Sequence, residues 1–170
     1  VSPRDAAHVL QNEYVTWEKH DLHSKSWINL TNEDSKRIAS NLGIAAADKE
    51  PLCLKCHATY LDENARQGAN YHIEDGVSCE TCHGAAENYL GPHTAKDSNR
   101  KSNLEHGMTD IVSYEKRAQL CISCHIGNED KYVSHRLIGA GHPRLSFELD
   151  TFSMIEPRHW IIDKDYIERK

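Results

Sequence analysis

All six cysteines of the chain occur in three copies of one short pattern, Cys-x-x-Cys-His. The copies are Cys53-Leu-Lys-Cys56-His57, Cys79-Glu-Thr-Cys82-His83 and Cys121-Ile-Ser-Cys124-His125. Two thiols separated by two residues can add to the two vinyl groups of one porphyrin, and the adjacent histidine then lies under the iron as a ligand. The sequence therefore predicts three covalently attached haem c groups, each with its iron.

Other chemistries use parts of this pattern. A lone Cys-x-x-Cys can be half of a zinc site or a thioredoxin-like redox pair, and six cysteines in an exported protein can form three disulfides. Neither alternative requires a histidine directly after each second cysteine, so three copies of that histidine favour haem. Because haem is attached to thiols outside the cytoplasm, the pattern also predicts a periplasmic or extracellular protein.

The chain is rich in histidine, the side chain that most often supplies the second axial ligand of a haem. Nine of the twelve histidines lie outside the motifs: His8, His20, His23, His72, His93, His106, His135, His142 and His159. Methionine, the other common ligand, occurs only as Met108 and Met154. Bis-histidine ligation with low reduction potentials is therefore expected. For the haems of His57 and His125 the best candidates are His135, His142 and His159, because they lie in one stretch after the last motif.

Composition limits the fold and the partners. Only 38% of the 170 residues are apolar and the mean hydropathy is −0.70, so we expect one domain over residues 1–170 in which haems fill the core. A net charge of −6 without blocks of one sign argues against a nucleic-acid partner. No apolar run is long enough to span a membrane. The start, Val1 to Arg4, is unlike a signal peptide, so we expect a mature or trimmed chain.

Apolar spacing predicts helices that would position the motifs. One helix is expected from Ala6 to about Trp27, carrying a histidine inward, and another from Asp34 or Ser35 to a stop at Gly43.

Further helices are expected from Ser113 into the third motif and around Val133 to Ile138, whereas residues 58–76 and 91–107 look like loops. Alternating strand patterns are nearly absent. The fold class predicted is mainly α with extensive loop.

Two segments resemble a known family. The stretch Gly76-Val-Ser-Cys79-Glu-Thr-Cys82-His83-Gly84, followed ten residues after His83 by His93, is similar to tetrahaem cytochromes c that accept electrons from hydroxylamine oxidoreductase. Trp17 with the downstream His23-Ser-Lys-Ser also resembles that family, and more loosely the multihaem superfamily of hydroxylamine oxidoreductase and pentahaem nitrite reductase. The segment from Gly139 to Trp160 resembles a related branch of multihaem cytochromes.

The resemblance implies particular ligands. It pairs His23, or His20 as the runner-up, with the haem of His83, and it pairs His93 with a first haem attached before Trp17. Residues 4–8, where that haem would attach, contain no cysteine. Three explanations stay open for His93: an upstream haem motif, a haem brought by another subunit, or reassignment to the haem of His57.

Electron transfer between redox partner proteins is the function that the sequence favours, and a role as one subunit of a larger redox complex or filament is compatible with it. Other multihaem subunits would make contact near His93, beside Tyr89, Leu90 and Pro92. The alternative is an oxidoreductase that acts on a small nitrogen or oxygen compound at an open haem. By the resemblance that haem is the one of His57, although His72, His135, His142 or His159 could each close it. The sequence thus favours an electron-transfer protein over an enzyme.

Overall fold

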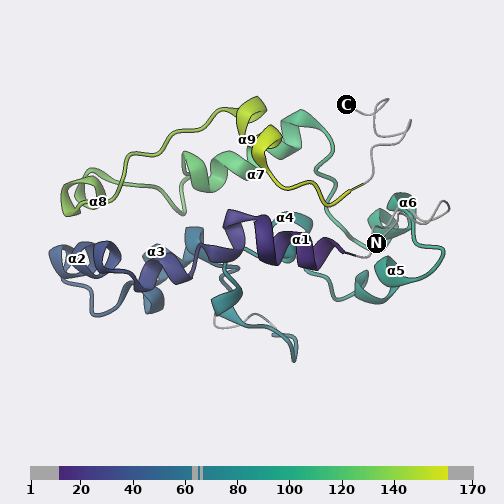
Figure 1. Ribbon diagram of the computed structural model, residues 1–170, viewed down its shortest axis with the longest axis horizontal. Coiled ribbons are helices and arrows are strands. Elements are labelled where there is room, and N and C mark those ends of the chain that lie inside the picture. Colours follow the sequence, from purple (N-terminus) through teal and green to yellow (C-terminus); the bar gives the residue numbers. More distant parts are fainter. Residues whose placement is uncertain (1–11, 63–64, 66, 161–170) are drawn as a thin grey trace.

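The structure, a computed structural model, describes residues 12–62, 65 and 67–160, and helices dominate these residues (Figure 1). The α-helices are α1 (Glu13–His20), α2 (Glu33–Leu42), α3 (Pro51–His57), α4 (Cys79–His83), α5 (Leu90–Thr94), α6 (Arg100–Glu105), α7 (Tyr114–His125), α8 (His135–Ala140) and α9 (Leu149–Ile155). Short 3-10 helices are η1 (Leu22–Lys25), η2 (Ile28–Thr31), η3 (Ala47–Lys49) and η4 (Ile73–Asp75). The described residues contain no strand, only an isolated bridge between Gly127 and Tyr132. The predicted mainly α class is confirmed.

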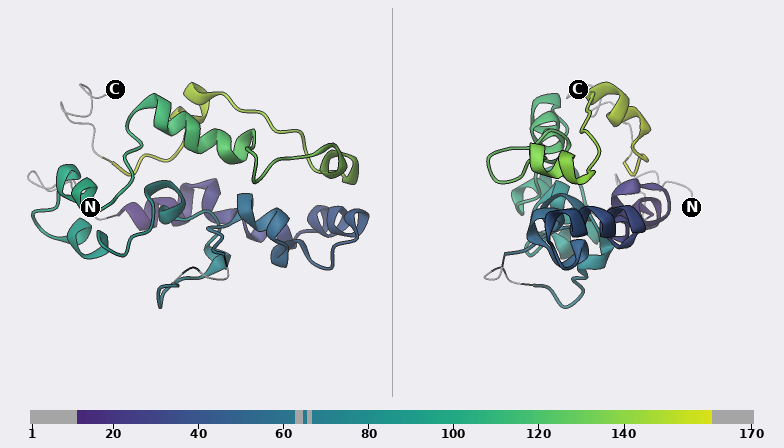
Figure 2. Two further views of the ribbon diagram at one scale, coloured as in Figure 1. Left: turned by 180° about the vertical axis from the view of Figure 1, so that it is seen from behind. Right: turned by 90° about the vertical axis from the view of Figure 1, so that its left-hand side faces the viewer.

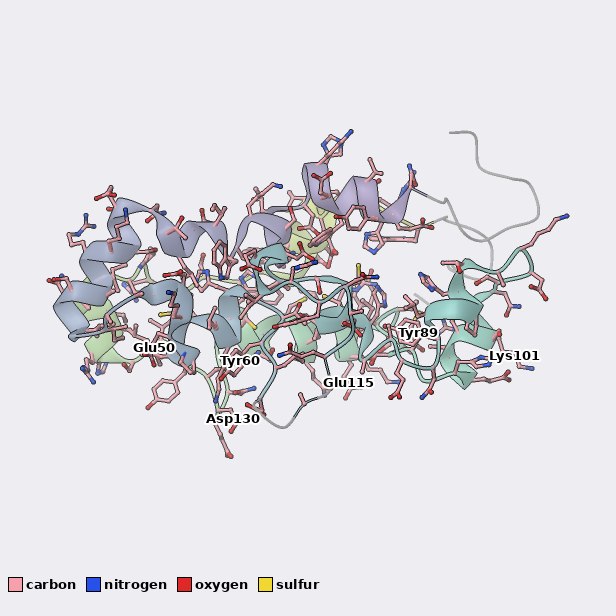
Figure 3. All side chains as sticks on the ribbon, turned by 90° about the horizontal axis from the view of Figure 1, so that it is seen from below. Glu50, Tyr60, Tyr89, Lys101, Glu115 and Asp130 are labelled. Carbon is pink, nitrogen blue, oxygen red and sulfur yellow. The ribbon has the colours of Figure 1, made fainter. Side chains whose placement is uncertain are left out.

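The helices lie in two layers (Figures 1 and 2). Helices α1 to α4, from the first half of the chain, form one layer, and α7, α8 and α9 form the other. At one end of the molecule α8 packs on α2, and at the other end lie α5 and α6. In Figure 3, Lys101 marks the α5–α6 end and Glu50 lies toward the opposite end. The two halves of the chain therefore face each other along the long axis.

Side chains join the layers where α2 meets α8. Leu42, Leu137 and Ala140 form a small buried cluster there. The Arg136 guanidinium donates to the Leu42 carbonyl oxygen at 2.8 Å, and the Asn41 amide donates to the Ala140 carbonyl oxygen at 2.9 Å. These two bonds also satisfy carbonyls at helix ends, which lack partners inside the helix.

Elsewhere the apolar core is thin. A second buried cluster lies within the first layer and consists mostly of small residues: Leu30, Ala39, Ala47, Leu54 and Ala58. No large side chain among the described residues is fully buried. This agrees with the low apolar content of the sequence.

Several helix ends follow the sequence signals. Ser113 caps α7 by accepting a hydrogen bond from the Lys116 N–H at 3.2 Å, as predicted. Gly43 ends α2 with φ of 73°, a conformation that suits glycine, as predicted. The predicted start of α2 was late, because Asn32 is the cap and accepts from the Ser35 N–H at 2.8 Å.

Other expectations were wrong. The long helix expected up to Trp27 ends at His20, where Asp21 becomes extended and η1 begins; residues 6–11 of that prediction lie outside the described residues. The predicted loop over residues 91–107 contains α5 and α6, the latter capped by Asn99, which accepts from the Ser102 N–H at 3.0 Å.

Gly76 occupies a position that no other residue fits well. Its φ is 74°, and an added Cβ would lie 2.7 Å from both the His23 carbonyl oxygen and the Ser26 hydroxyl. The segment that leads into α4 thus passes directly against the backbone of His23. Only a residue without Cβ allows both the left-handed conformation and this approach.

Replacing Gly76 by alanine should lower the free energy of unfolding of the haem-loaded protein by about 1–3 kcal/mol, because strain and a backbone clash combine. The midpoint of denaturant unfolding measures this effect. Gly68→Ala is the matched control, since its added Cβ would meet nothing within 4 Å and its φ is not positive. Equal midpoints for the two variants would contradict the packing argument.

Candidate haem-binding site

Each Cys-x-x-Cys-His motif forms the C-terminal end of a helix. The motif histidines His57, His83 and His125 are the last residues of α3, α4 and α7. Helical residues three apart lie on the same face, so the two thiols of each motif point to one side of the helix that carries the histidine. All six thiols are free of disulfides. This placement leaves them available to tether a group that the histidine contacts.

Each motif histidine faces one histidine from elsewhere in the chain. His57 faces His142 with ring centroids 6.4 Å apart, His83 faces His159 at 6.2 Å, and His125 faces His23 at 6.1 Å. Every pair joins a residue of the first half of the chain to one of the second half. Three pairs with nearly the same spacing therefore link the two layers.

The spacing of these pairs fits two axial ligands of one metal. A histidine nitrogen binds a transition metal at about 2 Å, so rings on opposite sides of one ion have centroids about 6 Å apart. Direct ring packing does not require three pairs to share this distance. The residues present therefore fit three haem irons, each held by a motif histidine and its facing histidine, with the two cysteines as tethers.

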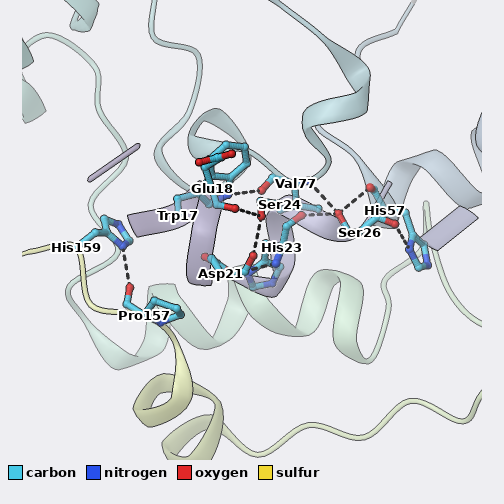
Figure 4. Close-up of polar contacts among 10 residues, drawn as sticks. All are labelled: Trp17, Glu18, Asp21, His23, Ser24, Ser26, His57, Val77, Pro157 and His159. Atoms are coloured by element: carbon cyan, nitrogen blue, oxygen red, sulfur yellow. Dashed lines mark hydrogen bonds and ion pairs between the residues drawn. The ribbon is translucent and has the colours of Figure 1, made fainter. Parts of the chain in front are cut away.

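Hydrogen bonds orient four of these rings through Nδ1. The Nδ1 of His57 lies 3.2 Å from the Ser26 carbonyl oxygen, that of His142 lies 2.8 Å from the Pro143 carbonyl oxygen, and that of His159 lies 3.2 Å from the Pro157 carbonyl oxygen. His23 instead has the Asp21 carboxylate as its Nδ1 partner, at 2.9 Å (Figure 4). A ring that donates from Nδ1 keeps the lone pair of Nε2 free for a metal.

The charge states of the motif histidines suit ligation as well. Burial lowers the pKa of His57, of His83 and of His125 below the ordinary value. These rings are therefore neutral at neutral pH, which is the form that binds metals. The pKa of His23 is raised, because its ring bonds the Asp21 carboxylate.

Ser26 connects the three parts of the first layer that carry ligands. Its hydroxyl lies 2.6 Å from the His23 carbonyl oxygen and 2.8 Å from the His57 carbonyl oxygen, and it accepts from the Val77 N–H at 3.0 Å (Figure 4). Trp17, buried on α1, donates to the Val77 carbonyl oxygen at 3.1 Å. A single polar junction thus fixes the relative positions of His23, α3 and the entry to α4.

The motif on α7 lies between the other two motifs. On one side, the Cys124 thiol lies close to the Cys56 thiol, and the Lys131 ammonium donates both to the Cys124 sulfur at 3.0 Å and to the Lys55 carbonyl oxygen at 3.3 Å. On the other side lies Cys82.

Burial raises the pKa of the Cys82 thiol to about 12, and the nearby Glu156 carboxylate and Cys121 thiol add to this effect. The three sites therefore form a row with the site of His125 in the middle.

The structure changes the predicted pairing. Sequence resemblance paired His23 with His83, whereas His23 faces His125 and His83 faces His159. His142 and His159 were expected to face His57 or His125; His142 faces His57, whereas His159 faces His83. His135 begins α8, is exposed, and faces no motif histidine among the described residues.

Of the predicted candidates, His93 also has no facing motif histidine in the described part of the chain. Its Nδ1 lies 2.6 Å from the Leu90 carbonyl oxygen and its ring contacts Tyr89. His20, His72 and His106 are exposed, and His8 lies outside the described residues.

Sequence reasoning missed four residues around the central pair. Phe147 and Phe152 contact the His125 ring at centroid distances of 5.6 and 5.1 Å. Asp21 and Ser26 were also missed. An aspartate two residues before His23 was a readable signal, since such a side chain reaches the backbone two residues on.

Comparison with known proteins agrees with this site. Residues 7–84, a little under half of the chain, match the family described as cytochrome c554 and c-prime. The match supports a c-type cytochrome. It covers the first two Cys-x-x-Cys-His motifs and His23, and it supports covalently bound haem, redox partners and haem-based electron transfer in general. No curated protein and no solved structure matches the chain. No helix in the described residues is long and apolar enough to cross a membrane.

If His57 and His142 bind one iron, replacing His142 by alanine should convert one haem of the loaded protein to high spin, because that iron would lose its second ligand. Electron paramagnetic resonance and the visible spectrum measure the change. His135→Ala, seven residues earlier in the same segment, is the control and should leave every haem low spin. The pairing is wrong if His135→Ala produces the high-spin iron and His142→Ala does not.

Proposed function

We propose that this cytochrome transfers electrons through three haem c groups, each bound by a motif histidine and the histidine that faces it. The observation that supports this proposal is the set of three histidine pairs whose ring centroids lie 6.1 to 6.4 Å apart. The haems supply reversible one-electron chemistry, and paired histidines keep both axial positions filled so that electrons move without a substrate. The protein supplies the tethers, the ring orientations and the spacing.

Proximity of the three motifs supports transfer along a row. The closeness of Cys56 to Cys124 and of Cys82 to Cys121 puts the attachment points of neighbouring groups side by side. The row follows the long axis of the molecule, from the α2–α8 end toward the α5–α6 end (Figure 1). Such an arrangement provides an entry and an exit at opposite ends.

The enzyme alternative needs an open position at the haem of His57. His142 faces that ring, and its Nδ1 bond to the Pro143 carbonyl oxygen turns Nε2 toward a metal. This geometry favours a closed site, so the electron-transfer proposal is preferred over action on a small nitrogen or oxygen compound. We place the protein in the periplasm or outside the cell, because haem is attached to thiols there.

The intact mass of the loaded chain tests the proposal first. It should exceed 19.3 kDa by three haem units, and acid acetone should not extract them. The oxidised protein should be purely low spin, and neither nitric oxide nor hydroxylamine should change its spectrum. A mass with two haems would refute the count. A high-spin signal that responds to either compound would refute electron transfer without substrate and support the enzyme.

We further propose that His93 binds a haem from outside residues 12–160, supplied by another multihaem subunit or by an upstream segment of the chain. Reassignment to the haem of His57 is less favoured, because His142 already faces His57. The ring of His93 donates from Nδ1 to the Leu90 carbonyl oxygen, so its Nε2 is free for a metal as in the three pairs. The exposed Leu90 beside it would form part of the contact.

Replacing His93 by alanine should leave all three haems of residues 1–170 low spin, because their ligands come from elsewhere. Titration with a haem-bearing partner should lose the spectral change that ligation by His93 causes. His106→Ala, on the neighbouring exposed end of α6, is the control. A new high-spin iron in His93→Ala without any partner would contradict the proposal and support reassignment.

A further inference from the structure

The Asp21 carboxylate is bound to the ligand ring of the central site. One oxygen, Oδ1, lies 2.9 Å from His23 Nδ1 and 2.9 Å from the His23 backbone nitrogen. In the described part of the chain both hydrogen bonds of this carboxylate come from His23. Asp21 is only 6% exposed, so water screens its charge poorly. Figure 4 shows Asp21 and His23 side by side.

This partner differs from those of the other ligand rings. The Nδ1 groups of His57, His142 and His159 bond neutral backbone carbonyls. A carboxylate is a stronger acceptor than a carbonyl, because it carries a full negative charge. A histidine that donates to a carboxylate is a more basic ligand, which gives more electron density to its metal. Of the rings with a described Nδ1 partner, His23 is therefore the strongest donor.

The pair of His23 and His125 lies in the middle of the row, so a stronger ligand there affects the order of the three reduction potentials. His23 faces His125, and α7 carries the middle motif of the three. A more basic ligand and a buried negative charge both stabilise the oxidised form of the iron that they adjoin. The reduction potential of the middle site is then lower than that of either neighbouring site.

We propose that Asp21 is a positioning residue that strengthens His23 as a ligand and makes the middle site of the row the one with the lowest reduction potential. This inference rests on the proposed three-haem function. Asp21 turns the His23 ring so that Nε2 faces His125, and its charge acts on the iron through that ring. The two outer sites, where His57, His142 and His159 bond neutral carbonyls, keep higher potentials and accept electrons first.

Asp21 also caps η1, because it accepts from the His23 N–H. A purely structural cap would hold the ring in place without affecting the potential. Asparagine caps helices as well as aspartate does and offers the same accepting oxygen, but it is neutral. The substitution Asp21→Asn therefore removes the charge and keeps the cap, which separates the two roles.

The test is a spectroelectrochemical titration of the loaded wild type and Asp21→Asn, with electron paramagnetic resonance at each potential. In the wild type, the resonance that His23→Ala abolishes should be the one reduced at the lowest potential. In Asp21→Asn that one midpoint should rise and its resonance should shift, while the other two midpoints stay unchanged. Asp34→Asn, which removes an exposed charge from α2, is the control and should shift none of them selectively.

Three results would overturn the inference while leaving the proposed function intact. The first is that the resonance assigned to His23 titrates at the highest or the intermediate potential in the wild type, a measurement that needs no folded Asp21 variant. The second is that all three midpoints of Asp21→Asn equal those of the wild type. The third is that all three midpoints move together in that variant. Failure of the function itself looks different, because then the wild type lacks three low-spin haems or His23→Ala yields no high-spin iron.

Discussion

The common distance between three pairs of facing histidine rings is the constraint on which this structure depends. Three pairs repeat a centroid spacing of 6.1 to 6.4 Å, and each pair has one ring in the first layer and one in the second. Side-chain packing joins the layers strongly at only one place among the described residues, where Leu42 meets Leu137. Binding of an iron by each histidine pair would therefore hold the two layers together, as a large apolar core does in most domains of this size.

The first layer is made rigid by polar contacts rather than by apolar bulk. The hydroxyl of Ser26 and the buried side chain of Thr59 each bridge segments far apart in sequence. Thr59 Oγ1 lies 2.8 Å from the Ser78 hydroxyl and 2.7 Å from the Thr81 hydroxyl, which ties the end of α3 to the start of α4. Because these bonds are directional, they fix how two motif helices are oriented as well as how far apart they lie. Small polar side chains are well suited to a site whose large groups are cofactors.

Local signals in the sequence were enough to predict much of the fold. Ser113 and Gly43 each act within a few residues, and the structure confirms the helix start at the first and the helix end at the second. The pairing of ligands could not be predicted in the same way, because it depends on which segments of the second layer lie above which motifs. His23 was recognised as a ligand candidate yet faces His125 instead of His83, since α7, which precedes the C-terminal segment, lies over the middle of the first layer. Short helices such as α5 and α6 were missed because their few residues carry almost no periodic signal.

The split of every pair between the two halves of the chain has a consequence for how the protein is made. If the protein is exported N-terminus first, as the proposed location implies, the motifs of His57 and His83 would leave the cytoplasm before His142 and His159. During that interval the exposed His20 and His72 are nearer in sequence and can bind in place of the native ligand. Contacts between distant residues form slowly in any case, because closing long loops costs entropy. If each facing pair binds a haem iron, maturation of the protein would be a competition for the iron, in which early, incorrect histidines must dissociate before the second layer can close.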